Sequence, residues 1–317
     1  MERRTPEEEL EYRRYLRKRI RMRKRRRQVM IARTIVGVVG LVMVFLIFYG
    51  IGKITGPVGG EDKKRAEATA KPTATPFVVD APEGYEEVCS KLYDMREDHP
   101  EVDDILINVG KYPLDLLELL TKNTETLSFV CDYLMHVDDE EATSGIVEDD
   151  LVNMIPLLQQ WDKRWGYTKY GDNMLAINGC GPTCMSMVYT GLTGNVDKNP
   201  AVLADFCIDN SYYTDDSGTS WALMTSGAEA LGLNAEKLSL TQDEIKERIE
   251  MGQPVICSMM PGDFTETGHF IVLWDITEEG KLLVNDPNSI LRSQTEWDFE
   301  VVFGQIKAAW AYSYTAE

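Results

Sequence analysis

The stretch Asn178-Gly-Cys-Gly-Pro-Thr-Cys184 is the most informative part of this 317-residue sequence, because it lies directly before a predicted helix. Glycine on each side of Cys180 lets backbone or substrate approach the thiol closely. A thiol at the start of a helix also meets the positive end of the helix dipole, which favours the thiolate form. Cys180 is therefore predicted to be an activated nucleophile.

A base and an acid lie downstream in separate motifs. His269 is the only histidine after residue 136 and opens a predicted strand, and Asp286 stands where the next predicted strand ends. If residues 277–280 form a hairpin turn, the two strands run antiparallel, and His269 and Asp286 fall within a residue or two of opposite each other. A carboxylate in that position can orient the imidazole while the other ring nitrogen faces a thiol. Cys180, His269 and Asp286 thus follow the logic of a catalytic triad.

An attack on a carbonyl group also requires hydrogen-bond donors for the developing oxyanion. Backbone N–H groups at the start of a helix supply part of this requirement, and an Asn or Gln amide commonly joins them. Gln160, within Leu157-Leu-Gln-Gln-Trp-Asp-Lys-Arg-Trp165, is the preferred candidate upstream of Cys180. Its neighbour Gln159 is the alternative.

Residues 151–317 combine helical and strand-like patterns. Thr241 and Glu244 form a capping-box pattern for a helix that ends at Gly252. The other predicted helices cover residues 182–192, 200–208, 222–231 and 296–307, and the predicted strands cover residues 254–260, 269–276, 281–285 and 308–314. Helices followed by an antiparallel sheet are typical of the α+β class, which is the fold class predicted here.

A long apolar segment lies near the N-terminus. Residues 34–52 contain no charged side chain, and as a helix they would span about 28 Å, close to the roughly 30 Å core of a bilayer. Residues 1–28 contain 13 Lys and Arg against 5 Asp and Glu, so the positive-inside rule places this basic tail in the cytoplasm and the bulk of the chain outside. A cleavable signal peptide is the alternative, but the run is too long and no convincing cleavage site lies after it. We predict an uncleaved transmembrane signal anchor over residues 29–53.

Two segments connect this anchor to residues 151–317. Residues 54–83 are rich in Gly, Pro, Ala, Thr and charge, and they predict a flexible linker. Residues 84–150 predict a small helical subdomain that ends in an acidic loop and packs on residues 151–317. Its two apolar stripes at helical spacing are Tyr85, Val88, Leu92 and Met95, and Leu127, Val130, Cys131 and Leu134.

The chain is acidic, with 52 Asp and Glu against 33 Lys and Arg and a net charge of −19. The acidic excess lies after the basic tail, because residues 72–317 contain 44 Asp and Glu against 14 Lys and Arg. Such a surface repels phosphate backbones, so nucleic-acid binding is not expected. A hydrophobic content of 44% also excludes a wholly disordered chain.

Four motifs occur along the second half of the chain in one order. They are Gln-Trp-Asp-Lys-Arg-Trp-Gly, Gly-Cys-Gly-Pro-Thr, Gly-His-Phe-Ile-Val-Leu and Val-Asn-Asp-Pro. This order resembles the peptidase C thirty-nine-like family of papain-like cysteine peptidases, which are related to double-glycine leader peptidases that process bacteriocins. The resemblance covers about residues 154–315. It implies a papain-like fold with the roles of nucleophile, general base, orienting acid and oxyanion donor on Cys180, His269, Asp286 and Gln160.

The remaining cysteines are interpreted mainly as structural. Cys184 lies one helical turn after the candidate nucleophile and is expected to face the core. Cys207 and Cys257 lie in apolar contexts, so packing is expected for them too. A disulfide between Cys89 and Cys131 stays open, because this part of the chain is predicted to be outside the cell.

Zinc binding by Cys180, Cys184 and His269 is disfavoured, because no second close pair of ligands exists, and no metal or cofactor is expected. The leading hypothesis is a membrane-anchored extracytoplasmic cysteine peptidase that acts on a peptide or protein, with cell-wall peptides as one candidate. The alternatives are an acyl transferase or amidase with the same residues, and a non-catalytic anchored module for peptide binding or adhesion. Leader processing beside a transporter is disfavoured, because the sequence contains one predicted span and no P-loop motif.

Overall fold

The computed structural model describes residues 81–139, 141–215 and 218–315. These residues belong to one compact unit of the chain. Within these ranges, no helix is both long enough and apolar enough to cross a lipid bilayer. The predicted basic tail (1–28), the predicted signal anchor (29–53) and most of the predicted linker (54–83) lie outside the described residues.

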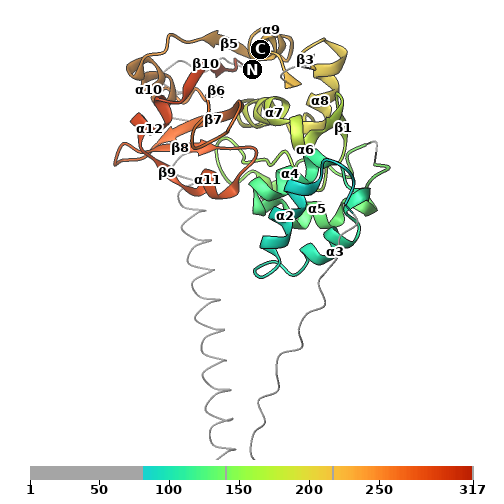
Figure 1. The fold of residues 1–317 in the computed structure, drawn as a ribbon. Helices are drawn as coiled ribbons and strands as arrows, with labels where there is room; N and C mark the ends of the chain where they lie inside the picture. Colours follow the sequence, from blue (N-terminus) through green and yellow to red (C-terminus); the bar gives the residue numbers. More distant parts are fainter. Residues whose placement is uncertain (1–80, 140, 216–217, 316–317) are drawn as a thin grey trace, which may run out of the picture. The chain divides into compact units, whose positions relative to one another are not determined.

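A six-stranded sheet organises the C-terminal part of the described chain (Figure 1). Its strand order is β5-β10-β6-β7-β8-β9, and every pair of neighbours is antiparallel. The strands are β5 (Asn234–Lys237), β6 (Val255–Met259), β7 (His269–Ile276), β8 (Leu282–Asn285), β9 (Glu296–Trp297) and β10 (Ile306–Ser313). Four of these strands, β6, β7, β8 and β10, agree with the predicted ranges to within two residues, and the α+β class is confirmed.

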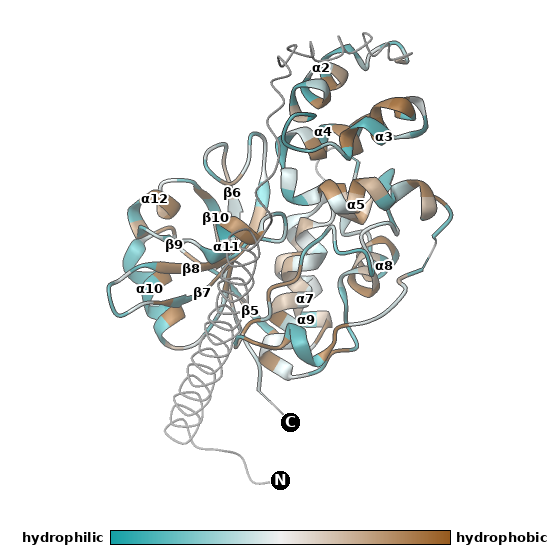
Figure 2. Ribbon diagram, turned by 90° about the horizontal axis from the view of Figure 1, so that it is seen from below, coloured by the Kyte–Doolittle hydropathy of each residue, from teal (hydrophilic) through white to brown (hydrophobic). Residues whose placement is uncertain are grey.

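Both faces of the sheet are covered. On one face, α7 (Cys180–Thr193) packs on a core that includes Ile256. On the other face, α10 (Gln242–Glu250) and α12 (Phe299–Phe303) pack on a second core that includes Cys257. Ile256 and Cys257 belong to different cores because successive side chains of a strand point to opposite faces. Helix α10 carries both hydrophilic and hydrophobic residues (Figure 2), as expected for a helix with one face on a core and the other in water.

Shorter elements surround this arrangement. The remaining helices of residues 151–315 are α6 (Leu175–Asn178), α8 (Pro200–Asp209), α9 (Ser226–Ala230) and α11 (Ile290–Gln294), with a 3₁₀ helix, η5, at Trp221–Met224. Two small hairpins pair β1 (Lys169–Tyr170) with β2 (Asn173–Met174) and β3 (Tyr213–Thr214) with β4 (Gly218–Thr219). The predicted helices over 182–192 and 200–208 are confirmed by α7 and α8. The predicted capping residue Thr241 accepts a hydrogen bond from the Glu244 N–H at the start of α10.

Two predicted helices differ from the structure. The predicted helix over 222–231 is divided into η5 and α9, because Thr225 leaves the helical region with φ −116° and ψ −90°. The predicted helix over 296–307 is wrong. Its first residues form edge strand β9, only Phe299–Phe303 are helical, and Ile306 already begins β10. The helical spacing of its apolar residues corresponds to an actual helix over little more than one turn. The residues that follow pair with β6 as strand β10.

The helical subdomain has a small core of its own. Its helices are α2 (Glu86–Met95), α3 (Val102–Ile107), α4 (Leu114–Lys122) and α5 (Leu127–Asp132), with 3₁₀ turns η1 (Val109–Lys111), η2 (Thr124–Thr126) and η3 (Tyr133–Met135). Its buried side chains include Val88, Leu92, Leu106, Leu116, Leu120, Phe129 and Val130. The two predicted stripes are therefore buried only in part.

The subdomain packs on the sheet-containing part, as expected. The Tyr167 hydroxyl donates to the Phe129 carbonyl oxygen at 2.8 Å, and the two rings stack with centroids 4.1 Å apart. The Lys163 ammonium pairs with Asp132. The acidic loop between the two parts, which ends in η4 (Glu148–Asp150), is also anchored, because Arg164 binds Asp150 with both terminal nitrogens.

Candidate active site

Cys180 is the first residue of α7, and the close packing around it explains the flanking glycines. A Cβ on Gly179 would meet the Leu175 carbonyl oxygen at 2.4 Å. A Cβ on Gly181 would meet the Thr219 side chain at 2.5 Å. Both positions therefore require glycine, because a larger side chain would collide with neighbouring atoms. The sequence alone did not reveal this reason. The Cys180 thiol is free and partly exposed.

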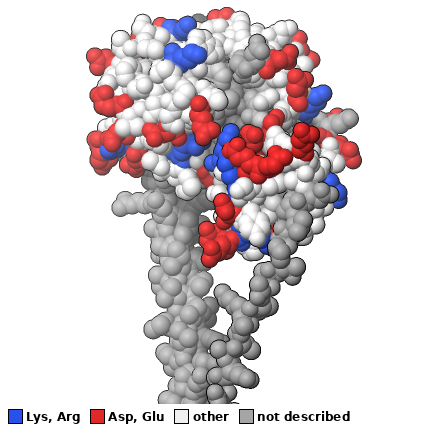
Figure 3. All heavy atoms as spheres, in the orientation of Figure 1, with Lys and Arg blue, Asp and Glu red and all other residues white. Residues whose placement is uncertain are grey.

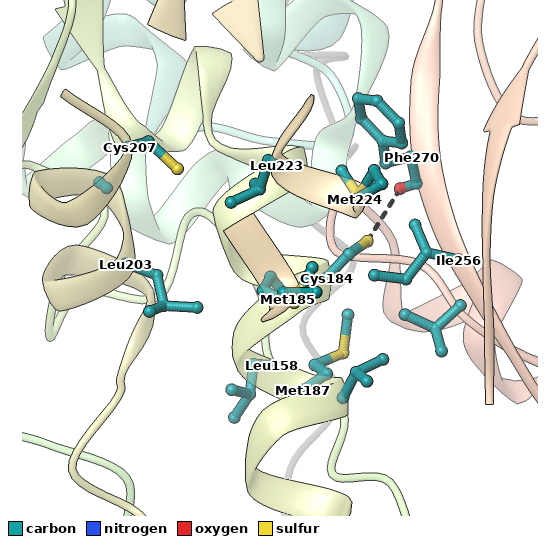
Figure 4. Close-up of a cluster of buried hydrophobic side chains, with 14 of the residues drawn as sticks. Leu158, Cys184, Met185, Met187, Leu203, Cys207, Leu223, Met224, Ile256 and Phe270 are labelled. Atoms are coloured by element: carbon teal, nitrogen blue, oxygen red, sulfur yellow. Dashed lines mark hydrogen bonds between the residues drawn. The ribbon is translucent and has the colours of Figure 1, made fainter. Parts of the chain in front are cut away.

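Cys184 connects α7 to strand β7. Its Sγ donates to the Phe270 carbonyl oxygen at 3.3 Å (Figure 4). Cys184 lies one helical turn after Cys180, and Phe270 directly follows His269, so this bond brings the start of the helix to the start of β7. Cys184 is fully buried, as predicted, and burial raises the pKa of its thiol far above the usual range.

His269 lies between a carboxylate and a thiol. Its Nε2 is 2.8 Å from Asp286 Oδ1, and both side chains are buried. The Cys180 thiol also acts on this imidazole and raises the pKa of His269. Burial lowers the pKa of His269, but the Asp286 charge, the Asp286 hydrogen bond and Cys180 outweigh it and raise the pKa to about 10. The imidazole is therefore protonated at neutral pH.

Asp286 is fully buried but has several hydrogen-bond partners. Besides His269, the Arg292 Nε donates to Oδ2 at 2.6 Å, and the Asn288 N–H donates to Oδ1 at 2.7 Å. Burial alone would raise the pKa of this carboxyl group. The His269 and Arg292 charges and hydrogen bonds reverse that effect and lower it below its usual value, so Asp286 stays ionised.

Arg292 was not predicted as part of this site. It lies in α11, six residues after Asp286, and its side chain is 27% exposed. The surrounding sequence contains no motif for such a contact, because the bond depends on how residues 286–292 turn back on themselves. Only the presence of a single arginine close after the predicted acid could have drawn attention to it.

The hairpin between β7 and β8 has the predicted direction, but a bulge changes its register. Ile276 pairs with Leu282, whereas Val272 pairs with Asn285, so one extra residue is accommodated near Trp274. Extended by one residue, this register sets position 271 against 286, two residues from His269. Positions 269 and 271 share a side of the strand, so the bulge puts His269 and Asp286 on the same side of the ribbon.

The predicted oxyanion donors lie beside this cluster with their amides engaged elsewhere. Gln160 Nε2 donates to the carbonyl oxygens of Ala176 at 2.7 Å and Ile177 at 3.2 Å, which lie four and three residues before Cys180. Gln159 Nε2 donates to the Asp286 carbonyl oxygen at 3.3 Å. Among the described residues, the Oε1 atoms of both side chains have no hydrogen-bond partner although they are buried. Either residue would have to rearrange in order to donate to an oxyanion, so this role stays a prediction.

The other cysteines lie apart from this cluster. Cys207 and Cys257 are fully buried in the two cores, as predicted, and burial raises the pKa of each thiol, to about 12 for Cys207. Cys89 and Cys131 are free and partly buried, so no disulfide joins them in this structure. The described residues contain no group of three or more His, Cys, Asp or Glu side chains arranged to hold a metal ion.

Comparisons with known proteins place the chain in a family. Residues 152–316 match the Peptidase_C39 like family. A solved structure with similarity to the chain is described as the crystal structure of a double glycine motif protease from an AMS/PCAT transporter in complex with the leader peptide. It is 15% identical, with a TM-score of 0.34, and the match covers 56% of this chain and 96% of that chain. A comparison with curated proteins found no match. The family match covers more than half of the chain, and the chain therefore belongs to the Peptidase_C39 like family and is a cysteine-type peptidase.

Proposed function

We propose that the protein hydrolyses peptide bonds with Cys180 as nucleophile, His269 as general acid and base, and Asp286 as the residue that orients the imidazole. The observation that supports this most strongly is the position of His269, whose Nε2 is bound by Asp286 while Cys180 interacts with the same ring. A protonated imidazole next to a thiol favours the thiolate, the reactive form of cysteine.

The reaction then proceeds in two steps. The Cys180 thiolate attacks the carbonyl carbon of the scissile bond, and His269 gives its proton to the leaving amine as a thioester forms. Water then attacks the thioester, His269 accepts a proton from it, and the acid product and the thiolate are released. Asp286 keeps one ring nitrogen occupied throughout, so the other nitrogen stays directed toward the reacting atoms.

The developing oxyanion needs at least two donors. Helix α7 begins at Cys180, and the first N–H groups of a helix have no partner within the helix. We propose that the Cys180 N–H is one donor and that the Gln160 amide becomes the other, after release of its bond to the Ile177 carbonyl oxygen. That bond is the longer of the two made by the Gln160 amide.

The proposed substrate is a peptide or protein segment. The protease in the solved structure is described as in complex with the leader peptide. Asp and Glu side chains spread over the visible face of the molecule, with fewer Lys and Arg (Figure 3). This charge favours a cationic peptide over an anionic one through long-range attraction.

We also propose that residues 29–53 anchor the protein in the cell membrane, with residues 1–28 in the cytoplasm and the peptidase outside. The uncharged run over 34–52 and the basic residues before it support this topology. A peptidase held in this way would act on substrates near the outer surface of the cell membrane, which keeps cell-wall peptides among the candidates.

A comparison of the wild type with Cys180→Ala and Cys180→Ser on a library of unlabelled peptides tests the catalytic proposal. We expect new N-termini with the wild type only, detected by mass spectrometry under reducing conditions. Added amines separate hydrolysis from acyl transfer, since an acyl transferase would yield amide adducts. Binding of library peptides without cleavage by any of the three proteins would contradict the proposal and favour a binding module.

A further inference from the structure

The helical subdomain contacts the segment that carries Asp286. This segment, residues 286–292, has Asp286 at one end and Arg292 at the other, and the two side chains bind each other. The sheet-containing part supports it from one side, where the Trp161 Nε1 donates to the Asn288 carbonyl oxygen at 3.3 Å. The subdomain supports it from another side, where the Asn123 amide donates to the same carbonyl oxygen.

Glu125 makes the most extensive contact between the subdomain and this segment. Its Oε1 accepts a hydrogen bond from the Ser289 hydroxyl. Its Oε2 accepts from the N–H groups of Ile290 at 2.8 Å and Leu291 at 3.2 Å. Ile290 and Leu291 are the first two residues of α11, the helix that carries Arg292. One carboxylate from a distant part of the sequence thus holds three donors at the start of that helix.

Glu125 is itself held in place. It lies in the tight turn η2, where the Asn123 side-chain oxygen accepts from the Glu125 N–H at 3.1 Å. The Thr126 hydroxyl donates to the Asn123 carbonyl oxygen at 2.7 Å, and Thr126 is fully buried. The turn therefore fixes the backbone of Glu125 independently of α11, so the carboxylate needs little further ordering to bind it.

We propose that Glu125 is a positioning residue for catalysis. By holding the start of α11, Glu125 fixes Arg292 against Asp286, and Asp286 in turn orients His269. The subdomain would then be a functional part of the peptidase and not only a spacer between the membrane and the catalytic domain. The inference rests on the role given to Asp286 in the proposed function.

The test uses the full chain and the rate at which iodoacetamide alkylates Cys180, because this readout requires no known substrate. We expect Glu125→Ala to lower the rate at pH 7 about tenfold, since small displacements of a catalytic group have large effects on rate. The acid limb of the pH–rate profile should move upward by about one pH unit, because a loosened Arg292 lowers the pKa of Asp286 less and weakens its pairing with His269. A purely structural role would leave the profile in place.

Two further variants sharpen the test. Glu125→Gln should stay within about threefold of the wild type, because its amide oxygen can accept from both N–H groups and its NH₂ group can donate to Ser289. Glu87→Ala is the matched control, since Glu87 lies in the same subdomain, is 82% exposed and pairs with Lys91. We expect no change of rate for this control.

A folded Glu125→Ala variant with the wild-type rate and profile would overturn the inference. If Glu125→Ala does not fold, Glu125→Gln decides, and a loss of tenfold or more in that variant would overturn the inference as well, since hydrogen-bond geometry should suffice. Cys180→Ala and Asp286→Asn, assayed with the peptide library, keep the two proposals apart. If both of these variants retain cleavage, the proposed function fails; if they lose it while Glu125→Ala reacts normally, only the role of Glu125 fails.

Discussion

At the scale of single residues, the site depends on one buried carboxylate with a cationic partner on each side. Burial of a charge is costly unless the charge is paired and hydrogen-bonded. Asp286 meets this condition, because His269 binds one oxygen and Arg292 binds the other. The same pairing keeps His269 protonated, so the charges of all three residues depend on one another.

The first prediction concerns stability in alkaline solution. The pKa of His269 is raised from 6.5 to about 10 in the folded protein, so its contribution to stability is fully present below pH 6.5 and is lost as pH rises through about 10. The free energy of unfolding of the wild type should therefore fall over this interval relative to His269→Gln. Urea unfolding of both proteins at several pH values measures the difference. Parallel curves between pH 6 and pH 10.5 would show that His269 is not paired as described.

The second prediction concerns stability in acid solution, where the contribution of Asp286 should depend on pH in the opposite direction. Its pKa is lowered in the folded protein, so its contribution to stability is present above its ordinary value of 3.8 and is lost as pH falls through the lower folded value. Relative to Asp286→Asn, the wild type should lose stability only below about pH 4. Acid unfolding followed by circular dichroism checks this, and an advantage already lost at pH 5 would contradict it.

A third prediction separates Arg292 from an ordinary surface arginine. Arg292→Gln leaves a fully buried carboxylate oxygen without its strongest partner, so we expect a loss of about 1–3 kcal/mol in the free energy of unfolding. Arg248→Gln is the control, because Arg248 is similarly exposed but pairs with the exposed Glu236, and such pairs contribute about 0–1 kcal/mol. Equal losses in the two variants, measured by urea unfolding, would mean that Arg292 does not support the Asp286 carboxylate.

At the scale of elements, the site forms where one helix and one strand begin. Helix α7 starts at Cys180 and strand β7 starts at His269, and the two elements are joined by a shared core and by the Cys184 bond to the Phe270 carbonyl oxygen. The start of α7 is also packed closely against β4 through Gly181 and Thr219. The nucleophile is therefore placed by elements packed on it from two sides.

This packing gives a prediction for Gly181→Ala. The added methyl group would lie within 2.6 Å of several Thr219 atoms, so we expect a loss of about 1–3 kcal/mol in stability together with reduced Cys180 reactivity. Gly145→Ala is the control, because a Cβ there meets no atom within 4 Å. Thermal unfolding of the two variants provides the comparison. If Gly181→Ala is as stable as Gly145→Ala, the start of α7 is less tightly packed than described.

Much of this arrangement could be predicted from the sequence, because its signals are local. Glycine and proline mark the start of α7, and apolar runs separated by turn residues mark β7 and β8. The bulge near Trp274 could not be predicted, since pairing register depends on contacts between both strands. Strand β5 was not predicted, because it is an edge strand with mostly exposed side chains and shows no alternation of apolar and polar residues. The contacts of Arg292 and Glu125 join residues that only the folded chain brings together.

At the scale of the whole molecule, the sequence combines a basic N-terminal tail, an apolar segment and an acidic remainder. The described part contains the peptidase and the helical subdomain, in contact through stacked rings, ion pairs and the Glu125 carboxylate. The anchor proposed for residues 29–53 would keep both at the membrane surface. Substrate choice would then depend on location as well as on the residues of the site.

The anchor predicts how the protein fractionates. The full chain should sediment with membranes and resist extraction by high salt and alkaline carbonate, because a transmembrane helix is held by apolar burial and not by charge. A variant that begins at residue 54 should stay in the soluble fraction. Release of the full chain by salt alone would contradict a transmembrane anchor and indicate attachment through the basic residues 1–28.

The most direct measurement of the central claim is the alkylation rate of each partly buried thiol, followed site by site by mass spectrometry in the native protein. Cys89 and Cys131 are internal references, because they are partly buried like Cys180 but lack an imidazole partner among the described residues. At pH 6 we expect Cys180 to react at least a hundredfold faster than either, and this advantage should disappear in His269→Gln. Equal rates for the three thiols, or an advantage that survives the loss of His269, would contradict the account.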